Sequence, residues 1–219
     1  MDPGGGEGAR GRKGPPPRRP LPPKGWREAA RRATEGAKPP QPPVPRGKPV
    51  PRALAIPARI LWTVGGLGLI PYGPGTFGTV AGVAIALFAT RHPGYDQQII
   101  LAFACAITLL GTPLASLAER VEGKDPRTFV WDEVAGYLVT MLGMPLREYA
   151  WLCVFGGFFA FRIFDILKPW PIRSIERKPG GIAVMADDIV AGFYANLTLR
   201  VILLVLPYLS SQNLSGQGL

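Results

Sequence analysis

Long uncharged stretches, separated by short charged segments, dominate the chain after its N-terminal part. Residues 99–118 are twenty consecutive uncharged residues, and residues 189–209 carry a single charge. A helix of about twenty residues crosses a bilayer core of about 30 Å. Shorter apolar stretches cover residues 79–90, 134–146 and 149–167. The pattern predicts an all-α, multi-pass membrane bundle with about four or five apolar spans. The short spans are extended by flanking residues or are partly re-entrant.

The N-terminal part has a different composition. Residues 1–59 contain fourteen Lys/Arg, four Asp/Glu and fifteen of the 25 prolines, whereas residues 60–219 contain eleven charged residues of each sign. This composition predicts a disordered, basic, proline-rich tail over residues 1–54. A membrane domain over residues 55–210 and a polar C-terminal tail, 211–219, follow. Nucleic-acid binding is not expected, because no aromatic interleaving accompanies the basic residues. The alternative to a purely solvated tail is contact with anionic lipid headgroups.

The order of the predicted spans places the charged connections on one side of the membrane. With the basic tail in the cytoplasm, connections 91–98 and 144–149 fall outside, and connections 65–78, 119–133 and 168–188 fall inside. The last of these is rich in Lys and Arg, as the positive-inside rule prefers. We therefore expect the segments with the richest chemistry to share the cytoplasmic face.

Histidine and cysteine chemistry is disfavoured by their number and place. His92 is the only histidine, and Cys105 and Cys153 lie within apolar stretches. A His-based zinc site and a Ser-His or Cys-His catalytic pair are therefore not expected. The cysteines are read as small hydrophobic residues, with no disulfide framework.

Acidic residues gather in or beside the predicted cytoplasmic segments. They are Asp132, Glu133, Asp165, Asp187 and Asp188. Interaction with a helix dipole, which contributes roughly 0.3–1 kcal/mol, is the alternative role for each adjacent pair. Converging carboxylates repel one another and need cations, and ligation by oxygen alone suits Mg²⁺. We predict that the five acids hold Mg²⁺ and that Asp132, Glu133, Asp165 and Asp188 are catalytic.

Cationic and glycine-rich segments complete the candidate site. Arg162, Lys168 and Arg173 could hold a phosphate, although ion pairs with Asp165 are the alternative for the first two. The loop GGLGLIPYGPGTFG contains Gly75 and Thr76, whose backbone amides and hydroxyl could contact the same phosphate. Such a loop also serves as a turn or a close-packing device. Together these features predict metal-assisted phosphoryl chemistry at a membrane surface, with a metal-activated water as the nucleophile.

Three segments resemble the phosphatidylglycerophosphatase A family of bacteria. They are GLGLIPYGPGTFGTVAG (66–82), VWDEVAGYLVTMLGMP (130–145) and FRIFDILKPWPIRSIERKPGGIAVMADDIVAG (161–192). The resemblance covers about residues 55–219 and implies an all-helical, Mg²⁺-dependent lipid phosphatase of the bacterial cytoplasmic (inner) membrane. The implied substrate is phosphatidylglycerophosphate, which is converted to phosphatidylglycerol. The family's recurring acidic positions correspond to the five acids named above.

Two alternatives stay open at this point. A phosphatase for another lipid or for a polyprenyl phosphate would use the same chemistry. A transporter with Arg162 and Asp165 as a charge relay belongs to a different class. A transport path needs polar groups near the bilayer midplane, so the clustering of the acids on one face disfavours it.

Overall fold

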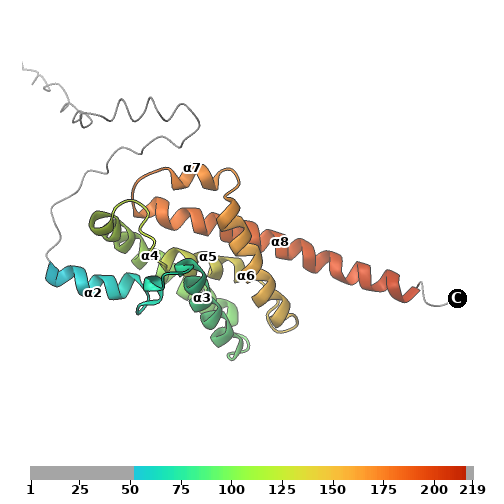
Figure 1. Ribbon diagram of the computed structural model, residues 1–219. Helices are drawn as coiled ribbons and strands as arrows, with labels where there is room; N and C mark the ends of the chain where they lie inside the picture. The colour runs from blue at the N-terminus through green and yellow to red at the C-terminus, as the bar shows by residue number, and fades with distance from the viewer. Residues whose placement is uncertain (1–51, 216–219) are drawn as a thin grey trace, which may run out of the picture. The chain divides into compact units, whose positions relative to one another are not determined.

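The computed structural model describes residues 52–215 of the chain, with side chains over residues 56–206. This part is all-helical and contains no strand (Figure 1). Its helices are α2 (Arg52–Trp62), the 3₁₀ helix η2 (Leu67–Leu69), α3 (Pro74–Thr90), α4 (Asp96–Glu122), α5 (Trp131–Met141), α6 (Ala150–Leu167), α7 (Ile172–Glu176) and α8 (Gly181–Ser215). The predicted N-terminal tail lies outside the described residues except for its last three. Helix α8 runs to Ser215, beyond the predicted boundary at residue 210.

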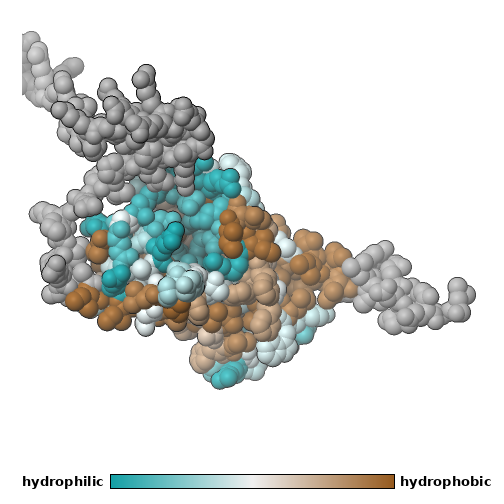
Figure 2. Space-filling model, in the orientation of Figure 1, coloured by the Kyte–Doolittle hydropathy of each residue, from teal (hydrophilic) through white to brown (hydrophobic). Residues whose placement is uncertain are grey.

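Three helices, α4, α6 and α8, are long and apolar enough to cross a membrane, and α3 is a shorter apolar helix of the same kind. Their outer faces expose large hydrophobic side chains, among them Leu109, Phe159 and Leu204 at 73%, 63% and 77% of their surface. Figure 2 shows a broad hydrophobic region over α6 and α8, with hydrophilic residues gathered between α4 and α7. Surfaces of this kind face lipid. The predicted all-α membrane bundle is confirmed.

Helix α5 is the centre of the bundle and packs against α3, α4, α6 and α8. It has eleven residues, too few to cross a bilayer alone, and Tyr137, Leu138 and Met141 are fully buried. Its tightest contact is with α8, where a Cβ built on Gly192 would overlap the backbone of Gly136. Glycines at both positions allow two helix backbones to touch, as small residues commonly do in membrane bundles.

The C-terminus of α5 is capped by side chains of α8. The amide nitrogen of Asn196 donates to the carbonyl oxygens of Val139, Thr140 and Leu142 at 3.4, 2.9 and 2.7 Å. Arg200 donates to the same Leu142 oxygen at 3.1 Å and to Asn196 Oδ1 at 2.9 Å. The last carbonyls of a helix have no partner within the helix, and an apolar surrounding offers none. These two side chains therefore let α5 end inside the bundle.

Hydrogen bonds group the connections at two ends of the bundle. At one end, Gln97 donates to the Met144 carbonyl at 3.0 Å and accepts from the Gly143 amide at 2.7 Å. At the other end, Lys124 donates to the Arg177 carbonyl at 2.9 Å. This is the grouping that the sequence predicts, with 91–98 beside 144–149 and 119–133 beside 168–188. The assignment of the second end to the cytoplasm stays a prediction.

Replacing Asn196 with alanine should destabilise the fold. The substitution removes the donor shared by three carbonyls at the C-terminal end of α5, so we expect a loss of about 2 kcal/mol, or roughly 4–8 °C in Tm. Thermal unfolding of the detergent-solubilised protein measures this, with L197A at the adjacent, half-exposed position as the control. An N196A variant that unfolds at the wild-type temperature would show that α5 does not need this cap.

Candidate active site

Three carboxylates converge where α5 begins beside α8. Asp132, Glu133 and Asp188 each place one oxygen within 4.8 Å of the others. Asp132 and Asp188 are buried, and Glu133 is partly buried. The structure therefore brings together members of two acidic pairs that lie more than fifty residues apart in the sequence.

Local structure explains why these acids face one another. The Val130 amide donates to the Trp62 carbonyl at 3.3 Å, which fixes the segment leading into α5. Both acids of α5 lie in its first turn, and Asp132 Oδ1 accepts from the Glu133 amide at 3.0 Å. One turn later, a Cβ on Gly136 would come within 2.5 Å of the Asp188 carbonyl oxygen. The close approach of the two backbones thus sets the separation of the carboxylates.

The C-terminal end of α6 contributes an ion pair to the same region. Arg162 Nη1 lies 2.7 Å from Asp165 Oδ2, and both side chains are largely buried. The contact lacks the geometry of a hydrogen bond, so this nitrogen has no hydrogen-bond acceptor. The Asp165 carboxyl group also interacts with Asp188. Arg162 and Asp165 therefore join the cluster, and the ion pair expected as their alternative role is also present.

Gly75, in the first turn of α3, closes another side of the cluster. A Cβ at this position would overlap Glu133 Oε1 and lie 3.1 Å from Arg162 Nη1. Only glycine leaves room for both side chains here. Thr76 follows in the same turn, where its amide donates to the Gly73 carbonyl at 2.9 Å. The glycine-rich loop therefore packs against the site, as well as forming a turn.

Lys168 forms ion pairs beside the three-carboxylate cluster. Its Nζ lies 2.9 Å from Asp187 Oδ2 and 3.4 Å from Glu176 Oε1. Burial lowers the pKa of Lys168, but the carboxylate of Asp187 more than offsets this, and the pKa lies above its ordinary value. Lys168 therefore stays charged and binds Asp187. That leaves Asp187 as a neighbour of the cluster, outside the set of three.

Arg173 lies on α7 and is exposed. Its guanidinium donates to the Leu167 carbonyl at 3.2 Å, where it caps the end of α6. Of the three cations predicted to hold phosphate, Arg162 is in the cluster, Lys168 is beside it, and Arg173 is not brought to it.

The cluster has more buried negative charge than its cations neutralise. Burial raises the pKa of Asp132 well above its ordinary value, and the charges of Glu133 and Asp188 raise it further. Burial likewise raises the pKa of Glu133, an effect that Arg162 opposes. Glu133 Oε2 is buried and has no hydrogen-bond partner. A compact group of desolvated oxygen donors with an unpartnered oxygen fits a hard divalent cation such as Mg²⁺.

Sequence reasoning missed two residues that hold α8 in place. Glu119 Oε2 accepts from the Gly180 amide at 3.0 Å, and Ser116 Oγ accepts from the Gly181 amide at 3.1 Å. Both belong to α4, and together they cap the first turn of the helix that carries Asp188. Glu119 is the first charge after the uncharged stretch 99–118, which is the one available signal. The sequence places it in a charged connection, whereas the structure buries it.

Comparison with known proteins gives a matching family and several relatives. Residues 60–203 match the family described as phosphatidylglycerophosphatase A. The phosphatidylglycerophosphatase A of Escherichia coli (strain K12) is 34% identical over 155 residues, which cover 68% of this chain and 87% of that protein. The protein of the same name from Haemophilus influenzae is 34% identical over 152 residues, 68% of this chain and 91% of that protein.

A third relative has a different name. It is the "Putative phosphatidylinositol-3-phosphatase" of Bacteroides thetaiotaomicron, 33% identical over 138 residues, which cover 62% of this chain and 87% of that protein. No solved structure matches the chain. Relatives of similar identity are therefore named for two different lipid phosphates.

Loss of the Glu119 carboxylate should loosen the start of α8. In E119A the Gly180 amide loses its acceptor, so we expect hydrogen exchange in the peptide spanning residues 178–186 to become roughly tenfold faster, the equivalent of about 1.4 kcal/mol. Mass spectrometry of the detergent-solubilised protein measures this, with E148A, an exposed acid at the other end of the bundle, as the control. Unchanged exchange in E119A would contradict the anchoring role.

Proposed function

The chain belongs to the phosphatidylglycerophosphatase A family, and from this premise we propose that it hydrolyses the terminal phosphomonoester of phosphatidylglycerophosphate to give phosphatidylglycerol and phosphate. The chain is a phosphatase, as its curated relatives are. The observation that carries the proposal is the convergence of Asp132, Glu133 and Asp188 beside the Arg162–Asp165 pair. We place the reaction in phospholipid synthesis at the cytoplasmic face of the bacterial inner membrane.

We further propose that Asp132, Glu133 and Asp188 hold Mg²⁺, with Asp165 and Asp187 as neighbouring acids. Support comes from the oxygen-only donor set, its burial and the unpartnered Glu133 Oε2. A bound Mg²⁺ would supply charge neutralisation and Lewis-acid polarisation of the phosphoryl oxygens. Lys168 restrains Asp187 through their 2.9 Å ion pair, which helps to fix the position of Asp188, the next residue of α8.

Arg162 is assigned to hold the substrate phosphate. Its guanidinium lies against Gly75, and its buried Nη1, although ion-paired with Asp165, has no hydrogen-bond acceptor. A phosphate oxygen would supply one. The Gly75 amide, in the first turn of α3, and the Thr76 hydroxyl would extend the same anion site. Asp165 orients Arg162 through their ion pair.

The proposed reaction exchanges one phosphorus–oxygen bond for another and transfers one proton. A water oxygen adds to phosphorus while the bond between phosphorus and the glycerol oxygen breaks, which yields phosphate and the lipid alcohol. The water loses a proton as it attacks, and the leaving glycerol oxygen gains one. We assign this transfer to Asp165, because its carboxylate is ion-paired with Arg162, the residue assigned to the phosphate.

Phosphatidylinositol 3-phosphate is the second candidate substrate, because one relative is named for an activity on that lipid. Polyprenyl phosphates are the other alternative within the same chemistry. The transporter alternative is disfavoured, since Arg162 and Asp165 pair with one another near the C-terminal end of α6. Phosphate release from the three lipids, presented separately and then in competition to one purified preparation, distinguishes these substrates.

Substituting the central acids should abolish phosphate release. We expect D165N and D188N each to lower kcat on phosphatidylglycerophosphate at least about 100-fold, because each removes a group that acts on the reacting phosphate or its cation. Release by the unsubstituted protein should require Mg²⁺ and stop on chelation. The control is E148Q, an exposed carboxylate outside the cluster. If both variants retain full activity while folded, the site is assigned wrongly.

A methyl group at Gly75 should disturb the site while leaving the bundle folded. In G75A the new Cβ overlaps Glu133 Oε1, so the carboxylate must move, and we expect kcat to fall roughly tenfold or more. The matched control is G156A, where the added Cβ meets only flexible leucine side chains. Thermal unfolding of both variants shows whether the fold is retained. Equal activity in the two variants would mean that Glu133 is not held where the reaction needs it.

A further inference from the structure

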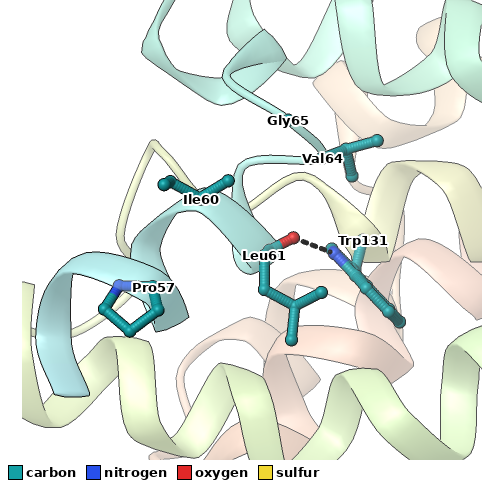
Figure 3. A pocket seen from close by; sticks show the side chains of 6 residues that line it. All are labelled: Pro57, Ile60, Leu61, Val64, Gly65 and Trp131. Atoms are coloured by element: carbon teal, nitrogen blue, oxygen red, sulfur yellow. Dashed lines mark hydrogen bonds between the residues drawn. The ribbon is translucent and has the colours of Figure 1, made fainter.

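An apolar groove lies between α2 and the start of α5. It has a volume of about 480 Å³ and is lined by Pro57, Ile60, Leu61, Val64, Gly65 and Trp131 (Figure 3). The indole nitrogen of Trp131 donates to the Leu61 carbonyl at 2.8 Å. The polar atom of the indole is therefore satisfied by the backbone of α2. The groove offers hydrocarbon contact and is of the size of a ligand pocket.

The groove adjoins the carboxylate cluster through the first turn of α5. Trp131 and Asp132 are consecutive residues of this helix, and adjacent helical side chains point about 100° apart. Trp131 therefore faces α2 while Asp132 faces the cluster. A molecule bound at the cluster and extending past the first turn of α5 would run toward the groove.

The groove is continuous with an exposed apolar face of α2, which can contact lipid chains. Helix α2 exposes Ile56 at 67% and Ile60 at 60% of their surface, whereas Arg59 is directed to Glu122 in a 3.0 Å ion pair. A helix with one exposed apolar face beside a charged one lies at the boundary between headgroups and acyl chains. The exposed Ile60 belongs to both this face and the groove, so the two are continuous.

We propose that the groove holds one acyl chain of the phospholipid substrate while its phosphomonoester lies at the carboxylate cluster. The inference rests on the proposed function in that the substrate is a lipid phosphate. A lining without charged groups recognises hydrocarbon and leaves headgroup recognition to the cluster. Because Trp131 is fixed to both α2 and α5, the groove sets the position of the lipid relative to Asp132.

Photolabelling tests the occupant directly. The probe is a non-hydrolysable phosphonate analogue of phosphatidylglycerophosphate with a diazirine on one acyl chain, added to the full chain in nanodiscs. We expect adducts on residues 57–65 and Trp131, reduced at least about fivefold by excess unlabelled analogue. A diazirine-labelled phosphatidylcholine should not give adducts that this analogue displaces. Adducts confined to other helices, or equal labelling by both probes, would overturn the proposal.

A pair of substitutions on α2 provides a kinetic test. I60N places a polar amide in the groove, whereas I56N makes the same change one turn earlier, outside it. The measured quantity is kcat/KM for the two-chain lipid divided by kcat/KM for the deacylated headgroup phosphate. We expect this ratio to fall about tenfold in I60N and to stay within about twofold in I56N. An unchanged ratio in I60N, or equal falls in both variants, would contradict the groove assignment.

The two proposals fail in different ways. If the unsubstituted protein releases no phosphate from any phosphatidylglycerophosphate, with Mg²⁺ present, the proposed function is wrong. If it releases phosphate but the probe labels residues elsewhere, only the groove assignment is wrong.

Discussion

The hydrogen-bonding groups at the two ends of α5 must be satisfied inside a bundle of apolar helices, and the rest of the structure follows from this constraint. At the C-terminus, Asn196 and Arg200 of α8 supply donors to the last carbonyls. At the N-terminus, the acids of the first turn face the positive end of the helix dipole and the neighbouring segments. A helix too short to cross the membrane thus places its charged end at one end of the bundle. The candidate active site forms there.

Small residues convert this arrangement into a compact site. The contact of Gly136 with Gly192 brings the backbones of α5 and α8 together, and Gly75 lets α3 approach Glu133 and Arg162. Three helices can therefore place their functional groups within a few ångströms of one another. Each acid alone would be a buried charge of high energy, and the Arg162–Asp165 and Lys168–Asp187 pairs compensate only part of it. The negative charge that remains uncompensated makes the cluster suited to a divalent cation, which would in turn favour a bound phosphate.

The membrane helices and the grouping of their connections could be predicted from the sequence, because both depend on local patterns of charged and uncharged residues. The uncharged stretches predict the membrane helices, and their alternation puts 65–78, 119–133 and 168–188 at one end of the bundle. Which charges meet depends on helix rotation and on tertiary packing, which spacing alone does not fix. Lys168 pairs with Asp187, Arg173 caps α6, and Glu119 is buried against the start of α8. The sequence also does not predict the groove at Trp131, because the residues that line it come from two segments with no charged motif.

Cation binding tests the central claim, that acids from α5 and α8 form one site, most directly. Mn²⁺ replaces Mg²⁺ in oxygen-ligand sites and can be followed by electron paramagnetic resonance in a titration of the full chain in detergent. We predict one saturable Mn²⁺ per chain, displaced by Mg²⁺ and weakened about tenfold or more by either E133Q or D188N. Binding that is absent from the unsubstituted protein, or that both variants retain at full affinity, would contradict the account.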